Sequence, residues 1–294
     1  DESYRIYSEL QGDGRFMVKL MCVNPASHLK ECMAKGRCTV FFSATLLPVT
    51  YYKELLSGNM EDYAVYAESP FPCENRLLLV AGDVSSKYTR RNRREFGKVL
   101  SYILEVAGQR RGNYMVFFPS YQYMNEILGL WEEQREELLS RGFDLLVQAS
   151  RMNEQEKEEF LREFEGERQD TLVAFCVMGG IFSEGIDLKE DRLIGVMVVG
   201  TGLPMVCTEQ EILRKYFDEK NERGFDYAFQ YPGMNKVMQA AGRVIRTMED
   251  KGVIVLMDDR FLREEYQALF PREWRPFKVV RRESVGEAVR EFWG

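Results

Sequence analysis

The sequence has little of what metal sites and disulfide frameworks are built from. It contains one histidine, His28, and its six cysteines form no Cys-x-x-Cys pair. Because the ligands of structural zinc usually come in such close pairs, we expect no zinc site. Scattered thiols favour a reducing compartment, and the cytoplasm fits best. The six residues are Cys22, Cys32, Cys38, Cys73, Cys176 and Cys207.

Long apolar runs and a leader peptide are missing as well. No stretch approaches the ~18 uncharged apolar residues that a membrane-spanning helix needs, so no membrane partner is expected. The chain begins Asp1-Glu2-Ser3, without a methionine and without a basic-then-apolar signal. We therefore expect the sequence to be a fragment of a longer protein.

What is present is typical of a globular protein with a sizeable core. The 294 residues are 45% hydrophobic and 30% charged, which allows one large or two small domains. The net charge of −7 argues against nucleic-acid binding, but local fields matter more than totals. Five of the eight residues 87–94 are basic, including Arg90 and Arg91. They are candidate contacts to a DNA backbone, and a solvated helix face is the alternative.

From residue 76 onward, apolar strands alternate with amphipathic helices. Asn153 and Glu156 have the spacing of a capping box at one helix start. The alternation indicates an α/β fold with a parallel sheet covered on both faces, whose ligands bind at the carboxyl ends of the strands. The predicted strands are 76–81, 114–118, 143–148, 172–177, 193–199 and 252–257, and the predicted helices are 87–107, 122–139, 153–164, 208–221 and 236–245.

The first forty-five residues have a separate pattern. They predict a strand at 16–23, a helix at 26–34 and a strand at 38–42. A turn at Pro48 and a short helix follow. The two predicted strands have no obvious neighbours in the alternating part of the chain.

The loop after the 172–177 strand carries unusual residues. Ser183, Glu184, Gly185 and Asp187 follow two further glycines, and glycines let a backbone approach a ligand closely. Ser183 could bond a phosphate oxygen, and Asp187 could accept from a ribose hydroxyl or orient an arginine. A plain turn with capping residues is the alternative.

A second polar group lies on the predicted helix near 236–247. Gln239, Arg243 and Arg246 are spaced i, i+4 and i+7, so they are expected to share one helix face. One amide and two guanidinium groups suit a polyanion such as a triphosphate. Gly242 would keep that face low for close approach, at a helix cost near ~1 kcal/mol against alanine. Plain surface arginines are the alternative.

Four segments in one order resemble motifs III, IV, V and VI of superfamily 2 helicases, most closely those of the XPD/DinG group. They are Ser-Ala-Thr-Leu at 43–46, Phe-Phe-Pro-Ser-Tyr at 117–121, Ser-Glu-Gly-Ile-Asp at 183–187 and Gln-x-x-Gly-Arg-x-Ile-Arg at 239–246. The last two are the specific ones. The resemblance implies a RecA-like α/β domain, in agreement with the alternation of strands and helices.

The resemblance also implies roles at the nucleotide. Arg246 matches the arginine finger and Arg243 its partner on the γ-phosphate, and Gln239 would face the nucleotide too. The segment that links nucleotide to DNA is matched by Glu184, Gly185 and Asp187.

Other matched residues lie on the DNA side. Ser183, Ser120 and Tyr121 would line the DNA, with Tyr121 a candidate platform for base stacking. Packing of that ring in the core is the alternative. Ser43 and Thr45 match the motif that couples hydrolysis to movement.

Parts of the family pattern are missing from this chain. There is no Gly-x-x-x-x-Gly-Lys-Ser/Thr phosphate loop, no Asp-Glu-x-His box, and no cysteine set matching the family's iron–sulfur cluster. All three belong to the first motor domain. Residues 1–47 would then be a remnant of that domain, and 48–294 the second RecA-like domain. ATP and Mg²⁺ would be bound mainly by the missing half, where an iron–sulfur cluster could also lie.

The resemblance therefore predicts part of an ATP-dependent DNA helicase that moves 5′ to 3′ on single-stranded DNA in repair or replication. The fragment alone is expected to be inactive, to need its N-terminal helicase domain in cis, and to self-associate. A RecA-like module that binds DNA or a partner without ATP turnover is the alternative. A chromatin or restriction motor of another superfamily 2 branch is a third interpretation, which the Phe-Phe-Pro-Ser-Tyr segment disfavours.

Overall fold

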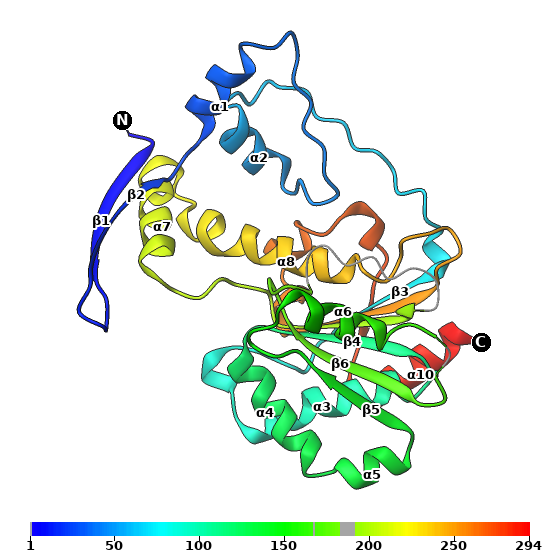
Figure 1. The fold of residues 1–294 in the computed structure, drawn as a ribbon. Helices are drawn as coiled ribbons and strands as arrows, with labels where there is room; N and C mark the ends of the chain where they lie inside the picture. Colours follow the sequence, from blue (N-terminus) through cyan, green and yellow to red (C-terminus); the bar gives the residue numbers. More distant parts are fainter. Residues whose placement is uncertain (1, 167, 183–191) are drawn as a thin grey trace. The chain divides into compact units, whose positions relative to one another are not determined.

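The computed structural model describes residues 2–166, 168–182 and 192–294 (Figure 1). The chain forms two compact units, each made of two stretches of sequence. One unit comprises 1–67 and 203–233, and the other comprises 68–202 and 234–294. None of the helices in the described ranges has the length and apolar character needed to cross a bilayer.

The larger unit, 68–202 with 234–294, is built on a seven-stranded sheet in which every pairing is parallel. The strand order is β5-β6-β4-β7-β8-β3-β9. This confirms the predicted parallel sheet and each of its six predicted strands. The strands are β3 Arg76–Ala81, β4 Asn113–Phe118, β5 Phe143–Val147, β6 Thr171–Val177, β7 Gly195–Val199, β8 Gly252–Met257 and β9 Lys278–Val280.

Both faces of this sheet are covered. Every residue of β4, β6, β7 and β8 is buried, as expected when helices pack on both sides of parallel strands. Phe118 and Phe175 meet on one face, with ring centroids 4.9 Å apart. Helices α3, α4 and α10 are grouped on one side of the sheet (Figure 1). The helices of this unit are α3 Arg93–Ala107, α4 Tyr121–Glu132, α5 Arg135–Ser140, α6 Glu154–Arg162, α9 Glu264–Gln267 and α10 Arg282–Trp293, together with most of α8 Tyr231–Ala241, which begins in the smaller unit.

Local sequence patterns predict some helix ends correctly and others incorrectly. The capping box of α6 is confirmed, because Asn153 accepts from the Glu156 amide and Glu156 from the Asn153 amide. The predicted start of α3 at residue 87 is wrong. Asn92 caps this helix by accepting from the Glu95 amide at 3.1 Å, so α3 begins at Arg93. The single helix predicted over 122–139 is divided into α4 and α5.

The C-terminal elements were not predicted. Strand β9 adds to the sheet beside β3, and the Gly82 amide extends the pairing by donating to the Val280 carbonyl at 3.1 Å. Helix α10 packs against α3. The tail is rich in arginine, and its apolar positions are too few to give a clear period.

The smaller unit, 1–67 with 203–233, contains a hairpin and short helices. Strands β1 Tyr4–Leu10 and β2 Phe16–Cys22 pair antiparallel, joined by a turn in which Gly14 has φ +83°. The strand at 16–23 and the helix at 26–34 were predicted, but β1 was not. The helices are α1 Ala26–Met33, α2 Val49–Leu56, α7 Thr208–Asn221 and the π-helix η4 Asp226–Gln230.

The strand predicted at 38–42 does not form. These residues adopt no regular structure, and Val40 and Phe42 are 76% and 90% exposed. A strand needs a hydrogen-bonded neighbour, and no described residue pairs with this segment. Residues 38–42 are apolar, as the sequence shows, but they would form a strand only beside a partner strand.

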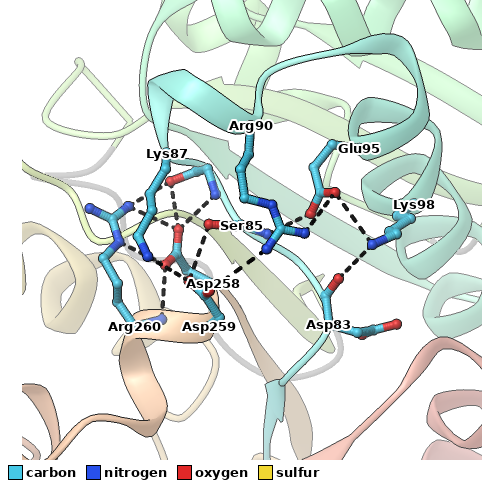
Figure 2. A network of polar contacts seen from close by, with 10 residues as sticks. Asp83, Ser85, Lys87, Arg90, Glu95, Lys98, Asp258, Asp259 and Arg260 are labelled. Carbon is cyan, nitrogen blue, oxygen red and sulfur yellow. Dashed lines mark hydrogen bonds and ion pairs between the residues drawn. The ribbon is translucent and has the colours of Figure 1, made fainter.

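A polar network joins the carboxyl ends of β3 and β8 (Figure 2). Asp258 follows β8 and is fully buried. Its carboxylate accepts from the amide and hydroxyl of Ser86 at 2.8 and 2.6 Å, and it pairs with Arg260 at 2.8 Å. Burial alone would raise the pKa of Asp258, but Arg260 and Ser86 outweigh it and hold the pKa below its usual range. Asp258 therefore remains ionised at neutral pH.

We expect Asp258→Ala to lower the free energy of unfolding by about 3–5 kcal/mol, because it leaves a buried guanidinium without its counter-charge. Asp259→Ala is the matched control. Asp259 is 29% exposed in its side chain, and its loss should cost no more than about 1 kcal/mol. Urea unfolding of both variants provides the measurement. The Asp258 contribution should be complete above about pH 4 and fade as the pH falls below that. Equal costs for the two variants would contradict this role.

Candidate functional site

The carboxyl ends of all seven strands lie at one edge of the sheet, because all seven run parallel. The loops that leave β3, β4, β5, β6 and β8 begin there. Most of the candidate residues in this unit follow one of these strands or lie near the end of α8. Ser183, Glu184, Gly185 and Asp187 follow β6 in the sequence and lie outside the described residues.

Helix α8 ends earlier than predicted. It stops at Ala241, so Gln239 lies in its last turn while Arg243 and Arg246 lie beyond it. The Arg243 amide donates to the carbonyl three residues back, at 3.3 Å, and no longer four back. The prediction of three side chains on one continuous helix face is therefore wrong. Gly242 follows the helix and is not in its interior.

Asp250 holds the backbone that follows the helix. Its Oδ2 atom accepts from the amides of Arg246 and Thr247 at 2.6 and 2.7 Å, and its Oδ1 atom accepts from the Thr247 hydroxyl at 3.0 Å. Continued helix would need the first two amides for carbonyls four residues back. Asp250 is 4% exposed. It fixes the backbone of Arg246 in a tight turn.

The two arginines differ in environment. Arg243 is 8% exposed, whereas Arg246 is exposed. Gly242 between helix and turn is exposed too, and a Cβ added there would lie 3.1 Å from the Met238 carbonyl oxygen. Arg246 is thus the guanidinium of this segment that a ligand in solvent can reach directly.

Lysine 236 lies on α8 one turn before Gln239. Lys236 is half-buried, and burial lowers the pKa of its ammonium. Its aliphatic chain passes Gly179, the φ +70° residue after β6, where an added Cβ would lie 3.2 Å from the lysine Cε. No sequence motif pointed to Lys236.

Ser120 and Tyr121 lie where β4 passes into α4. The Ser120 hydroxyl caps α4 by accepting from the Tyr123 amide at 3.2 Å. The Tyr121 hydroxyl donates to the Ala149 carbonyl at 3.2 Å and accepts from Gln148 at 2.9 Å. Burial raises the pKa of Tyr121, whose ring packs partly against the core. The ring is thereby held at one position, half-buried and half-exposed.

No sequence motif pointed to Gln148. It is 2% exposed, and its amide oxygen accepts from the Val177 amide at 2.9 Å. This side chain therefore joins the exits of β5 and β6 to the Tyr121 phenol. A glutamine at the end of an apolar strand is the only trace of it in the sequence.

Acidic neighbours partly neutralise the basic run at 87–94. Arg90 lies 3.3 Å from Glu95 and 4.0 Å from Asp259 (Figure 2). Arg91 donates to the Ser86 carbonyl at 3.2 Å and lies over the ring of Tyr123, 5.3 Å from its centroid. Arg90 and Arg91 precede α3, so neither belongs to a helix face of α3.

Ser43 and Thr45 belong to the smaller unit. Their hydroxyls lie 3.2 Å apart, and the Thr45 amide donates to the Ser43 hydroxyl at 3.2 Å. Such side-chain turns are typical of serine and threonine in loops. Sequence and structure agree that this segment precedes α2.

Comparisons with known proteins give one consistent result. Residues 103–277 match the family model described as the helicase C-terminal domain. The chain is 25% identical to the ATP-dependent DNA helicase CHL1 of Scheffersomyces stipitis, over 96% of this chain and 37% of that protein. It is 29% identical to the ATP-dependent DNA helicase DDX11 of Danio rerio, over 87% of this chain and 32% of that protein. The chain thus spans about a third of the length of these relatives.

Solved structures show a similar fold. A structure of an XPD helicase superimposes with a TM-score of 0.68 at 20% identity, over 95% of this chain and 48% of that one. At this identity the likeness concerns the fold alone.

We expect Asp250→Ala to destabilise the chain by about 1–3 kcal/mol, because three donors lose one buried acceptor. Thr247→Val is the matched control, since it removes one of the three contacts and should cost less. Chemical denaturation gives both values. An Asp250→Ala variant as stable as the unsubstituted chain would show that the turn does not depend on this carboxylate.

Proposed function

Because the chain belongs to the family of helicase C-terminal domains, we propose that it is the second motor domain of an ATP-dependent DNA helicase. The observation that carries the proposal is the turn after α8. It holds an exposed arginine, Arg246, at a backbone position fixed by Asp250. The segment also has the motif spacing that resembles the arginine finger of superfamily 2 helicases.

The residues after α8 are of the kinds that bind a nucleoside triphosphate. Arg246 presents a planar guanidinium, which pairs well with phosphate oxygens, and Gly242 offers backbone without a side chain beside it. When bound, Mg²⁺-ATP supplies the transferable phosphoryl group, and a first motor domain would hold most of it. Arg246 would place its positive charge where negative charge develops during transfer. Buried Arg243 would support that position from behind, and Gln239 would face the nucleotide from the last turn of α8.

The DNA side of the proposal rests on the exit of β4. A hydroxyl can donate while it accepts, so Ser120 can cap α4 and still give its proton to a phosphate oxygen. The fixed ring of Tyr121 would offer a surface for base stacking. Arg90 and Arg91 would add positive charge, reduced by Glu95 and Asp259. Single-stranded DNA, 5′ to 3′ movement and a role in repair or replication are the finer parts of the proposal.

A non-catalytic module that holds DNA or a partner is the second candidate. It has no need for a buried carboxylate that fixes an exposed arginine beside a glycine. The two candidates differ in what Arg246 does, so a single substitution separates them.

In the full-length protein, Arg246→Ala should lower kcat for ATP hydrolysis on the order of 10³-fold, while the affinity for DNA changes little. Arg162→Ala is the matched control, because Arg162 is an exposed arginine on α6 that pairs with Glu158 one turn away. Steady-state ATPase rates and DNA titrations test both. Lost DNA binding with intact ATPase would mean that Arg246 contacts DNA and not nucleotide.

Exposed apolar side chains in the smaller unit support a missing partner domain. Both strands of the hairpin carry them, as does the segment 40–42. Apolar surface of this kind marks an interface in the intact protein. We propose that a first motor domain covers it in cis. The residues are Ile6, Leu10, Phe16, Val18, Leu20, Val40, Phe41 and Phe42, between 45% and 90% exposed.

The 294-residue chain alone should therefore self-associate. Sedimentation velocity at several concentrations should show an average mass that rises with concentration. The double variant Phe16→Lys/Leu20→Lys should reduce the association, because it places charge on an open strand. A chain that is monomeric throughout, with Phe41 and Phe42 protected from solvent, would contradict the missing-partner interpretation.

A further inference from the structure

A glutamate in the smaller unit gathers three donors from a different part of the chain. Glu54, on α2, accepts from the Tyr227 hydroxyl, from Lys220 Nζ at 3.0 Å and from Asn221 Nδ2 at 3.2 Å. Its side chain is only 19% exposed. Burial alone would raise the pKa of Glu54, but these donors outweigh it and lower the pKa, so the group remains charged at neutral pH.

Aromatic packing joins the same elements a second time. The Tyr51 ring, one turn before Glu54, meets Tyr227 edge-on at 5.0 Å and Tyr231 edge-on at 5.1 Å between centroids. Phe217 of α7 stacks on Tyr227 at 4.3 Å. Burial raises the pKa of Tyr51 to about 12. We call Tyr51 and Glu54 with their partners on α7 and η4 the α2 clamp.

The α2 clamp is directly connected along the chain to two segments that carry candidate functional residues. Helix α2 begins at Val49, shortly after Thr45. On the other side, η4 passes into α8 without a break, because Tyr231 ends one and begins the other in helical conformation. Gln239 lies eight residues beyond Tyr231, or about 12 Å along the helix at 1.5 Å per residue. A continuous helix is a stiff link over that distance.

We propose that Tyr51 and Glu54 are positioning residues for ATP turnover, which fix η4, the turn that leads directly into α8, to the helix that follows Ser43 and Thr45. This inference rests on the proposed function, in which Gln239 faces the nucleotide and Ser43 and Thr45 couple hydrolysis to DNA. The clamp would let the state of one segment bias the other. The π-helix is consistent with this role, since such turns are frequent at functional sites and rare elsewhere.

The chemistry of the clamp favours positioning over simple packing. A leucine at position 54 could fill the same space beside the tyrosines without desolvating a charge. A carboxylate with three directional donors instead selects one arrangement of α2 against α7 and η4. In an intermediate arrangement the three donors would no longer reach the partly buried Glu54 carboxylate. Such arrangements are therefore disfavoured.

Hydrogen exchange on the 294-residue chain tests the structural half. Glu54→Ala should speed exchange of the amides in 226–241 on the order of tenfold, while β4 and β6 of the sheet are unaffected. Glu211→Ala is the matched control, because Glu211 lies on α7 and pairs with Arg214, one turn away. Unchanged exchange in 226–241 in the Glu54 variant would overturn the proposal.

Kinetics of the full-length protein test the functional half. Glu54→Ala should lower DNA-stimulated kcat on the order of tenfold with KM for ATP within about twofold, since binding groups are intact but misplaced. Glu54→Gln keeps an acceptor for Tyr227 and should recover at least half of the rate. Glu211→Gln should leave the rate unchanged.

Three kinetic results would also overturn the inference, and one of them separates it from the proposed function. If the loss of rate in Glu54→Ala is no larger than the fraction of this variant that thermal melts show to be unfolded, then Glu54 has only a structural role. Wild-type rates for Glu54→Ala beside an impaired Arg246→Ala would remove the clamp and leave the motor function standing. Wild-type rates for both variants would remove the proposed function and the inference with it.

Discussion

Parallel pairing is the constraint on which the larger unit depends. Parallel neighbours cannot be joined by tight turns, so each connection crosses a face of the sheet and every strand leaves at the same edge. Both faces are therefore covered and the strands are apolar throughout, as in β4 and β6. Buried polar side chains therefore collect at the ends of the strands. Asp258, Gln148 and Ser120 each follow the last residues of a different strand.

At this edge, buried polar groups hold the loops in place. Asp258 joins the exits of β3 and β8 through Ser86 and Arg260, and Gln148 joins those of β5 and β6. Burying the polar groups of Asp258 and Gln148 has a desolvation cost, which only hydrogen bonds to these groups offset. Loops held in this way can present exposed side chains at fixed positions. Glu95 and Asp259, which pair with Arg90 at this edge, explain why the basic run in the sequence overstates the positive charge available to a ligand.

Features that depend on residues close together in the chain were predicted from the sequence, whereas features that depend on distant residues were not. Helix α7 and strand β8 have the predicted bounds, 208–221 and 252–257, because periodicity and local turns determine them. Helix α8 ends at Ala241, four residues before the predicted end, and Asp250 holds the Arg246 and Thr247 amides in a turn beyond it. Residues 38–42 have the composition of a strand but lack a neighbour to pair with. Motif order predicted the family, whereas the contacts of Gln148 and Glu54 span too many residues to leave a local pattern.

The contrast between Arg243 and Arg246 follows from the same reasoning. Both belong to one short motif, yet one is buried and the other exposed. On an unbroken helix their side chains would lie about 60° apart in projection, at the 100° per residue of an α-helix. The turn fixed by Asp250 separates their environments. Arg243 is buried, which removes its side chain from direct contact with a ligand in solvent. Arg246 is exposed, and its backbone is fixed by Asp250.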